Sequence, residues 1–179
     1  ELPAAGSVNR LVPQQVRAFE RNIAGVNMAY AKRKNLTVFD VVTIASLIDR
    51  EVSVARERKV VAAVIYNRLK AGIPLGIDAT SRFETENWTA PLTNAVLQKD
   101  TPYNTRINKG LPPGPIGSPG LAAMQAAARP AGSGYLYYVA NPCRPGTHTF
   151  TKTYEEFQAA ADRYNAAREK AGGRQPSGC

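Results

Sequence analysis

The stretch of residues 37–72 constrains this chain most, because it contains two helical patterns in tandem. Thr37 and Asp40 stand three residues apart and resemble a capping box, with aspartate where glutamate is usual. The residues that follow at steps of three and four define one helix face, which is apolar until it reaches a glutamate: Val41, Ile44, Ile48, Glu51 and Ala55. The spacing therefore predicts a helix whose apolar stripe ends in the carboxylate of Glu51.

A carboxylate on the apolar side of a helix is poorly hydrated, and desolvation raises its pKa because it disfavours the charged form. Such a group can hold a proton near neutral pH and transfer it to a leaving oxygen. The pattern makes Glu51 a candidate general acid. A structural alternative stays open, in which Glu51 turns outward at a fraying helix end or pairs with Arg56 or Arg58.

A second helix is predicted directly after the first and ends before Gly72, a residue typical of helix C-termini. Its apolar stripe consists of Val60, Val61, Val64, Ile65 and Leu69. Its polar residues are expected at the surface, hydrated or paired there: Glu57, Arg58, Asn67 and Arg68.

The rest of the chain predicts further helices, one hairpin and a long loop. Helical patterns cover residues 13–35, 92–97, 118–128 and 154–170, and strands at 135–140 and 147–151 flank a short loop. Residues 1–11 are expected to be a lead-in, and residues 73–83 to be extended. Residues 101–119 hold five prolines and are expected to form a stiff loop that shapes a functional surface. Together these patterns predict a single α+β domain, rich in helix, with a small antiparallel β-sheet.

Composition limits the partners of the chain. Its formal net charge of +9 favours an anionic partner. Nucleic acid is not expected, because no basic stripe is interleaved with aromatic residues at regular spacing. The one histidine and two cysteines give no zinc-ligand spacing. No apolar run approaches the roughly 20 residues that a membrane-spanning helix needs.

The two cysteines, Cys143 and Cys179, allow one disulfide. A bridge would tie the glycine-rich C-terminal tail to the hairpin loop and would fit an oxidising compartment. Two independent thiols are an equally good interpretation of the sequence.

Three blocks of sequence, in the same order, resemble the catalytic domain of the YceG-like endolytic murein transglycosylases. The first begins with ASLIDRE at residues 45–51 and continues to VIYNRL at 64–69. The second is YNT at 103–105, followed by GLPPGPI at 110–116. The third is YYVA at 137–140, followed by THTF at 147–150. The blocks cover most of the chain.

The resemblance implies a peptidoglycan lytic transglycosylase that cleaves the β-1,4 bond between N-acetylmuramic acid and N-acetylglucosamine. Glu51 matches the catalytic glutamate of the family, and it would act first as acid and then as base, with no metal or organic cofactor. Six further residues are implied as sugar contacts or as groups that orient Glu51: Asp78, Thr80, Tyr103, Asn104, Thr105 and His148.

The sequence departs from the family pattern at four positions. Gly76 and Ala79 stand where glutamine and proline are expected, Arg106 replaces a tyrosine, and Phe157 replaces a histidine of the final helix. These changes bear on individual sugar contacts and leave Glu51 untouched.

We expect a lead-in and N-terminal helix at residues 1–36, a YceG-like catalytic domain at 37–171 and a tail at 172–179. The resemblance further implies a longer protein with an N-terminal membrane anchor outside this chain. The catalytic domain would then lie on the extracytoplasmic side of the cell membrane, with peptidoglycan strands as substrate and the cell-wall synthesis machinery as partner.

Two other functions stay open. A hydrolase of lysozyme type would use Asp78 as a second carboxylate. A non-catalytic module would bind glycan without cutting it. The products separate these readings, because hydrolysis leaves a reducing end and transglycosylation leaves an anhydro end.

Overall fold

The computed structural model of the protein describes residues 8–179, so residues 1–7 of the predicted lead-in lie outside the described part. Its elements, in chain order, are α1 (Val8–Ala24), α2 (Ala29–Lys32), α3 (Val38–Glu51), the short 3-10 helix η1 (Ala55–Glu57), α4 (Arg58–Ala71), α5 (Asp78–Thr85), α6 (Asn94–Leu97), α7 (Leu121–Ala128), β1 (Tyr137–Ala140), β2 (His148–Thr151) and α8 (Tyr154–Lys170). The two strands pair antiparallel. This confirms the predicted α+β class, rich in helix with a small sheet.

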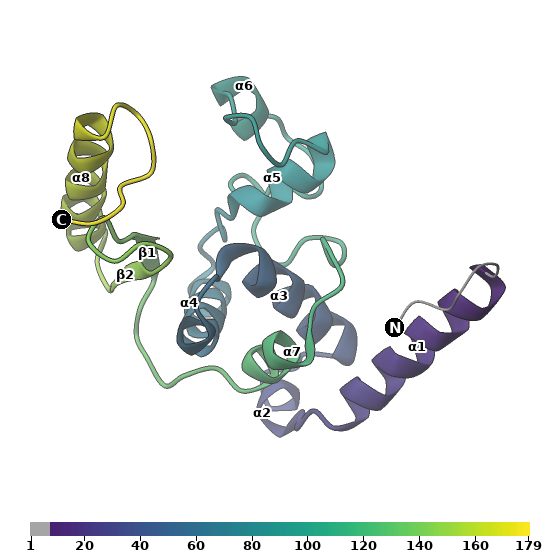
Figure 1. Ribbon diagram of the computed structural model, residues 1–179. Coiled ribbons are helices and arrows are strands. Elements are labelled where there is room, and N and C mark those ends of the chain that lie inside the picture. Colours follow the sequence, from purple (N-terminus) through teal and green to yellow (C-terminus); the bar gives the residue numbers. More distant parts are fainter. Residues whose placement is uncertain (1–7) are drawn as a thin grey trace.

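Helix α3 lies at the centre, with α4 and α7 against it (Figure 1). Its N-terminus carries the predicted capping box, in which the Thr37 hydroxyl accepts the Asp40 N–H at 3.2 Å and the Asp40 carboxylate accepts the Thr37 N–H at 2.8 Å. Helix α7 can approach closely because most of its buried residues are alanines. The core between the three helices includes Ile44, Leu47, Ile48, Val61, Ile65 and Met124.

Helix α4 ends at Gly72, as predicted, because this glycine takes the left-handed conformation with φ 65°. The Tyr66 hydroxyl of α4 donates to the carbonyl oxygen of Ala127 in α7 at 2.8 Å. Burial raises the pKa of Tyr66 to about 12, so this hydroxyl keeps its proton and holds the two helices together at neutral pH.

The proline-rich loop is fixed to α3 at two points. The Ser46 hydroxyl accepts the N–H of Ile116 at 3.0 Å, and the Asp49 carboxylate accepts the N–H of Gly120 at 2.8 Å. Ile116 itself is buried in the core. The loop therefore belongs to the rigid part of the domain.

The predicted helix at residues 13–35 is wrong in extent, because two helices occupy this region. Helix α1 begins at Val8, within the predicted lead-in, and ends at Ala24. The chain then turns at Gly25 and buries Val26 in the core. The Asn27 side chain accepts the N–H of Ala29, where α2 starts. The apolar spacing in the sequence continues beyond Ala24, but the burial of Val26 in the core ends the helix there.

The prediction of an extended segment and loop at residues 73–83 agrees with residues 73–77, which lie outside any helix, but is wrong from Asp78, where α5 begins. The Thr80 hydroxyl donates to the carbonyl of Ile77 at 2.7 Å, and the Ile77 N–H donates to the Thr105 hydroxyl at 3.0 Å. Thr105 lies 28 residues further along the chain. A hydrogen bond between residues so far apart in sequence cannot be predicted from local periodicity.

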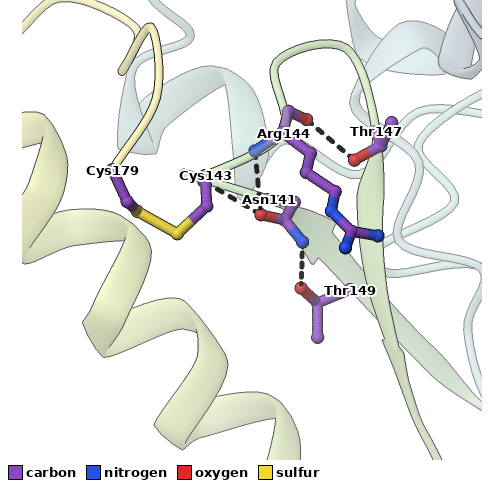
Figure 2. Close-up of a disulfide and its surroundings, with 6 residues drawn as sticks. All are labelled: Asn141, Cys143, Arg144, Thr147, Thr149 and Cys179. Carbon is purple, nitrogen blue, oxygen red and sulfur yellow. Dashed lines mark hydrogen bonds between the residues drawn. A yellow bond between two sulfur atoms is a disulfide. The ribbon is translucent and has the colours of Figure 1, made fainter.

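The β1–β2 hairpin and α8 form a layer beside α4 and α3 (Figure 1). Helix α8 spans the predicted range and begins with a capping box between Thr153 and Glu156. Cys143 and Cys179 form a disulfide that ties the C-terminal tail to the hairpin loop (Figure 2). Among the described residues, we find no helix that is both long and apolar enough to cross a membrane.

Candidate active site

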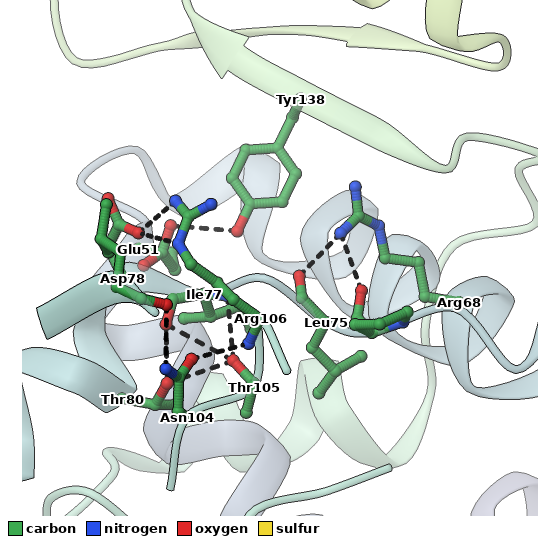
Figure 3. A network of polar contacts seen from close by, with 12 residues as sticks. Glu51, Arg68, Leu75, Ile77, Asp78, Thr80, Asn104, Thr105, Arg106 and Tyr138 are labelled. Carbon is green, nitrogen blue, oxygen red and sulfur yellow. Dashed lines mark hydrogen bonds and ion pairs between the residues drawn. The ribbon is translucent and has the colours of Figure 1, made fainter. Parts of the chain in front are cut away.

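Glu51 is the last residue of α3, at the point where the β1–β2 hairpin and the start of α5 meet this helix (Figure 3). The helix ends because Val52 adopts an extended conformation, while its N–H still donates to the Ile48 carbonyl. The Tyr138 hydroxyl of β1 donates to Glu51 Oε2 at 3.0 Å. The carboxylate is therefore directed inward and held by a hydrogen bond.

The structural alternative for Glu51 is wrong on both counts. The residue does not turn outward, because its side chain meets Tyr138 across the domain. It also does not pair with Arg58, which lies 3.7 Å from Asp49 instead. No ion pair among residues 8–179 involves Glu51 or Arg56.

The surroundings of Glu51 raise its pKa above the ordinary glutamate value of 4.5. Burial is the largest cause, and the charge of Asp78 acts in the same direction. The hydrogen bond from Tyr138, the charge of His148 and the backbone N–H of Ala79 oppose it with smaller effects. Glu51 thus keeps its proton to a higher pH than an exposed glutamate does.

Tyr138 remains a hydrogen-bond donor throughout the neutral range. Burial raises its pKa well above the ordinary value of 10.0, and the charge of Glu51 and the hydrogen bond to it raise it further. A tyrosine that keeps its proton can stabilise Glu51 after the glutamate has lost its own.

A second pair of ionisable residues supports the ring of Tyr138. His148 Nδ1 lies 2.8 Å from Glu57 Oε2, and the His148 backbone N–H donates to Glu57 Oε1 at 3.1 Å. The ring of His148 meets the ring of Tyr138 edge to face, with centroids 5.2 Å apart. In the hairpin register, Ala140 faces His148 and Tyr138 faces Phe150, so Tyr138 and His148 share one face of the sheet.

A third pair lies at the start of α5. Both the Nε and Nη2 atoms of Arg106 donate to Asp78 Oδ1, the former at 2.9 Å. Both side chains are substantially exposed. Asp78 is thus paired with Arg106, the residue that replaces the tyrosine of the family pattern.

Comparison with known proteins identifies the family of the chain. A model of the YceG-like family matches residues 1–163. The chain belongs to the YceG-like family.

Two similar proteins are both named endolytic murein transglycosylase. The one from Bacillus subtilis (strain 168) is 35% identical over 139 residues, which are 78% of this chain and 38% of that protein. The one from Streptococcus pneumoniae (strain R6) is 33% identical over 140 residues, 75% of this chain and 25% of that protein. The chain thus spans well under half the length of these relatives.

A crystal structure of a YceG-like protein from Listeria monocytogenes is similar in three dimensions, with a TM-score of 0.77 and 34% sequence identity. The match covers 89% of this chain and 51% of that one. The fold of the domain is therefore that of the YceG-like family.

Within this YceG-like domain, three of the predicted site residues form a buried cluster apart from Glu51. The hydroxyls of Thr80 and Thr105 lie 3.1 Å apart and bond to the backbone of Ile77. The Asn104 amide donates to the carbonyls of Leu97 and Lys99. All three side chains are buried and bonded within the protein. Thr80 and Thr105 fix Ile77, directly before α5, whereas Asn104 fixes the turn at residues 97–106.

Tyr103 is placed between the loop and α5. Its ring packs against Phe83 with centroids 5.0 Å apart, and its hydroxyl lies close to Gly114 of the proline-rich loop. Of the predicted residues, Asp78 and His148 are the ones whose charges act on Glu51.

Sequence reasoning missed Tyr138 as a site residue, although its block was recognised. The signal was present, because alternation along two paired strands puts Tyr138 and His148 on one face. The prediction that the polar residues of the second helix are surface decoration is wrong for Glu57, which is 7% exposed. It is also wrong for Arg68, whose guanidinium donates to the carbonyls of Leu75 and Leu136 and so joins the α5 segment to the hairpin.

Proposed function

We propose that this chain is the catalytic domain of an endolytic peptidoglycan lytic transglycosylase. The observation that carries the proposal is Glu51, a carboxyl group with a raised pKa that is hydrogen-bonded to Tyr138. Membership of the YceG-like family and the names of the similar proteins support the same reading.

In the first step, the protonated Glu51 carboxyl group donates its proton to the glycosidic oxygen between N-acetylmuramic acid and N-acetylglucosamine. The bond from C1 of the muramyl residue to that oxygen breaks, and positive charge develops at C1 and the ring oxygen. Burial favours this step because it raises the pKa of Glu51 and so favours the protonated form of the acid before reaction.

In the second step, the Glu51 carboxylate takes the proton of the C6 hydroxyl of the same muramyl residue. The C6 oxygen forms a bond to C1, which gives a 1,6-anhydro end, and Glu51 is protonated again. Atoms and charges balance without water. The Tyr138 hydroxyl stabilises the carboxylate between the two steps, since it remains a donor.

A lysozyme-type hydrolase is the second candidate, because the charge of Asp78 acts on Glu51. The structure favours the transglycosylase over it. The Asp78 carboxylate lies at the exposed start of α5 and accepts two hydrogen bonds from Arg106 on Oδ1, so one of its oxygens is already engaged within the protein.

We further propose that the domain works on the extracytoplasmic side of the cell membrane, held there by an anchor outside this chain, and trims or terminates new glycan strands beside the synthesis machinery. The Cys143–Cys179 disulfide supports an oxidising compartment. The greater length of the similar proteins supports further segments.

The test is digestion of purified peptidoglycan by the chain and by Glu51→Gln, with products identified by mass spectrometry. The proposal expects anhydromuramyl ends from the unmodified chain and none from the variant. Reducing ends would assign the site to a hydrolase. Binding of peptidoglycan by both proteins without any cleavage would assign the chain to the glycan-binding modules.

A further inference from the structure

A cavity of about 510 Å³ lies beside η1 and the start of α4, and four basic side chains line it: Arg56, Arg58, Lys59 and Arg129. Asn27 and Gln125 add amide groups to the wall, and the remaining lining residues are small. None of the lining residues is acidic. A concave wall that carries charge of one sign concentrates its electrostatic potential and attracts counter-ions.

Most of this positive charge is not neutralised within the protein. Arg58 lies 3.7 Å from Asp49, but the other three cations form no ion pair with any residue of the described chain. The Nε atom of Arg58 is buried and has no hydrogen-bond partner there. Glu57, the nearest acidic residue in sequence, is committed to His148.

Two segments that are distant in sequence build the cavity, and a backbone hydrogen bond fixes them together. The N–H of Ala131 donates to the carbonyl oxygen of Lys59 at 2.9 Å. This bond holds the segment of Arg129, directly after α7, against the start of α4. The backbone that carries the cations is thus fixed, and the side chains of Arg56, Lys59 and Arg129 are exposed to solvent and accessible to an anion.

The cavity is close to Glu51 along the chain. Ala55, which lines it, follows Glu51 by four residues, so their Cα atoms are at most about 14 Å apart even in a fully extended chain. A peptide of about four residues, attached to the sugar that reacts at Glu51, spans a distance of this size when extended.

We infer that this cavity binds carboxylates of the peptide stem that each muramyl residue of peptidoglycan carries. The inference rests on the proposed function for the identity of the glycan. The glycan backbone itself is uncharged where its muramyl residues carry stems, whereas the stem supplies carboxylates on a short, flexible peptide attached to the muramyl residue. Arginine is suited to this role because its planar guanidinium pairs with carboxylates through two hydrogen bonds.

The test compares two probes, peptidoglycan strands with intact stems and the same strands stripped of stems by an amidase, with the lactyl carboxylates that this cut exposes then capped as neutral amides. Affinity is measured in the Glu51→Gln background, so that no cutting occurs, and kcat/KM is measured with Glu51 intact. We expect Lys59→Ala with Arg129→Ala to lower affinity and kcat/KM for stem-bearing strands about tenfold, since hydrogen bonds between charged groups contribute at this level. Stripped strands should be unaffected. Lys70→Ala, on the last turn of the same helix, is the matched control and should change neither.

Equal effects on both probes, or no effect on either, would overturn the inference. Competition by inorganic phosphate or a phosphodiester wall polymer, together with equal binding of stem-bearing and stripped strands, would reassign the cavity to phosphate. The proposed function fails separately. If stems strengthen binding through the cavity but no anhydro ends form, then the cavity inference stands and the transglycosylase proposal falls.

Discussion

Two polar clusters of this domain both contain hydroxyl groups, but they differ in what their hydrogen bonds do. Thr80, Asn104 and Thr105 are buried and bonded to backbone atoms, with hydroxyl and amide groups that are fully used. Glu51 and Tyr138 bond to each other, and burial shifts the pKa of both. The difference teaches that a side chain suited to hydrogen-bonding a sugar can instead have its hydrogen bonds within the fold, whereas an acid with a shifted pKa is the stronger candidate for catalysis.

The largest expected effect is on the second cluster. Glu51→Gln should lower the rate of peptidoglycan cleavage by at least about a hundredfold, because general acid and base catalysis contributes 10²–10⁴. The measurement is product formation per folded protein, with circular dichroism to confirm the fold. Retention of more than a tenth of the rate would remove Glu51 from the mechanism.

The same variant tests the raised pKa through stability. Between the ordinary carboxyl pKa of 4.5 and the raised folded value, the native protein binds more protons than the unfolded chain, so wild-type stability falls as pH rises through that window. Glutamine cannot ionise and removes this fall. We expect the stability gain of Glu51→Gln to be smallest below pH 4.5 and largest above the folded pKa, measured by urea unfolding at several pH values. A gain that does not change with pH would contradict the raised pKa.

Substitutions in the Thr80, Asn104 and Thr105 cluster should change the free energy of unfolding more than the rate of cleavage. Thr105→Val keeps the shape but leaves the buried Ile77 N–H without its acceptor, which should cost about 1–3 kcal/mol in the free energy of unfolding. Thr89→Val, at an exposed position, should stay within about 0.5 kcal/mol. If Thr105→Val unfolded like the wild type but lost cleavage, then Thr105 would belong to the sugar contacts.

Removal of the Tyr138 hydroxyl distinguishes its hydrogen bond to Glu51 from the packing of its ring. Tyr138→Phe keeps the ring against His148 and loses the hydrogen bond to Glu51, so kcat should fall about tenfold with little change in KM. That bond lowers the pKa of Glu51, so the alkaline limb of the pH–rate profile should move to higher pH. Tyr137→Phe, on the opposite face of the strand, is the control. A pure loss of stability with an unchanged pH profile would leave Tyr138 only a structural role.

The smallest effect is expected at the exposed ion pair. Arg106→Tyr restores the residue type of the family pattern and removes the cation from Asp78. The freed charge of Asp78 should raise the pKa of Glu51 and move the alkaline limb upward, with less than about a threefold change in rate, because exposed pairs contribute little. Lys109→Tyr, in the same loop, should leave the profile in place. A downward movement would show that Arg106 acts on Glu51 other than through Asp78.

Sequence alone determined the elements whose causes are local. The capping box at Thr37 and the apolar spacing that follows it predict α3, with Glu51 near its C-terminus. Gly72 marks the end of α4. Alternation set the hairpin, and α8 followed from its own cap and spacing. Helix periodicity and capping act over three or four residues, so they can be read from the chain directly.

Only the tertiary structure decided what surrounds Glu51. Tyr138 lies 87 residues from Glu51 in sequence, and His148 lies 91 residues from Glu57. It also decided that α5 is a helix, that the two cysteines are joined, and that Glu57 is buried rather than solvated. The physical reason is the same in each case. Burial and hydrogen bonding between distant segments set the pKa of an acid and override local propensity, and neither has a period in the sequence.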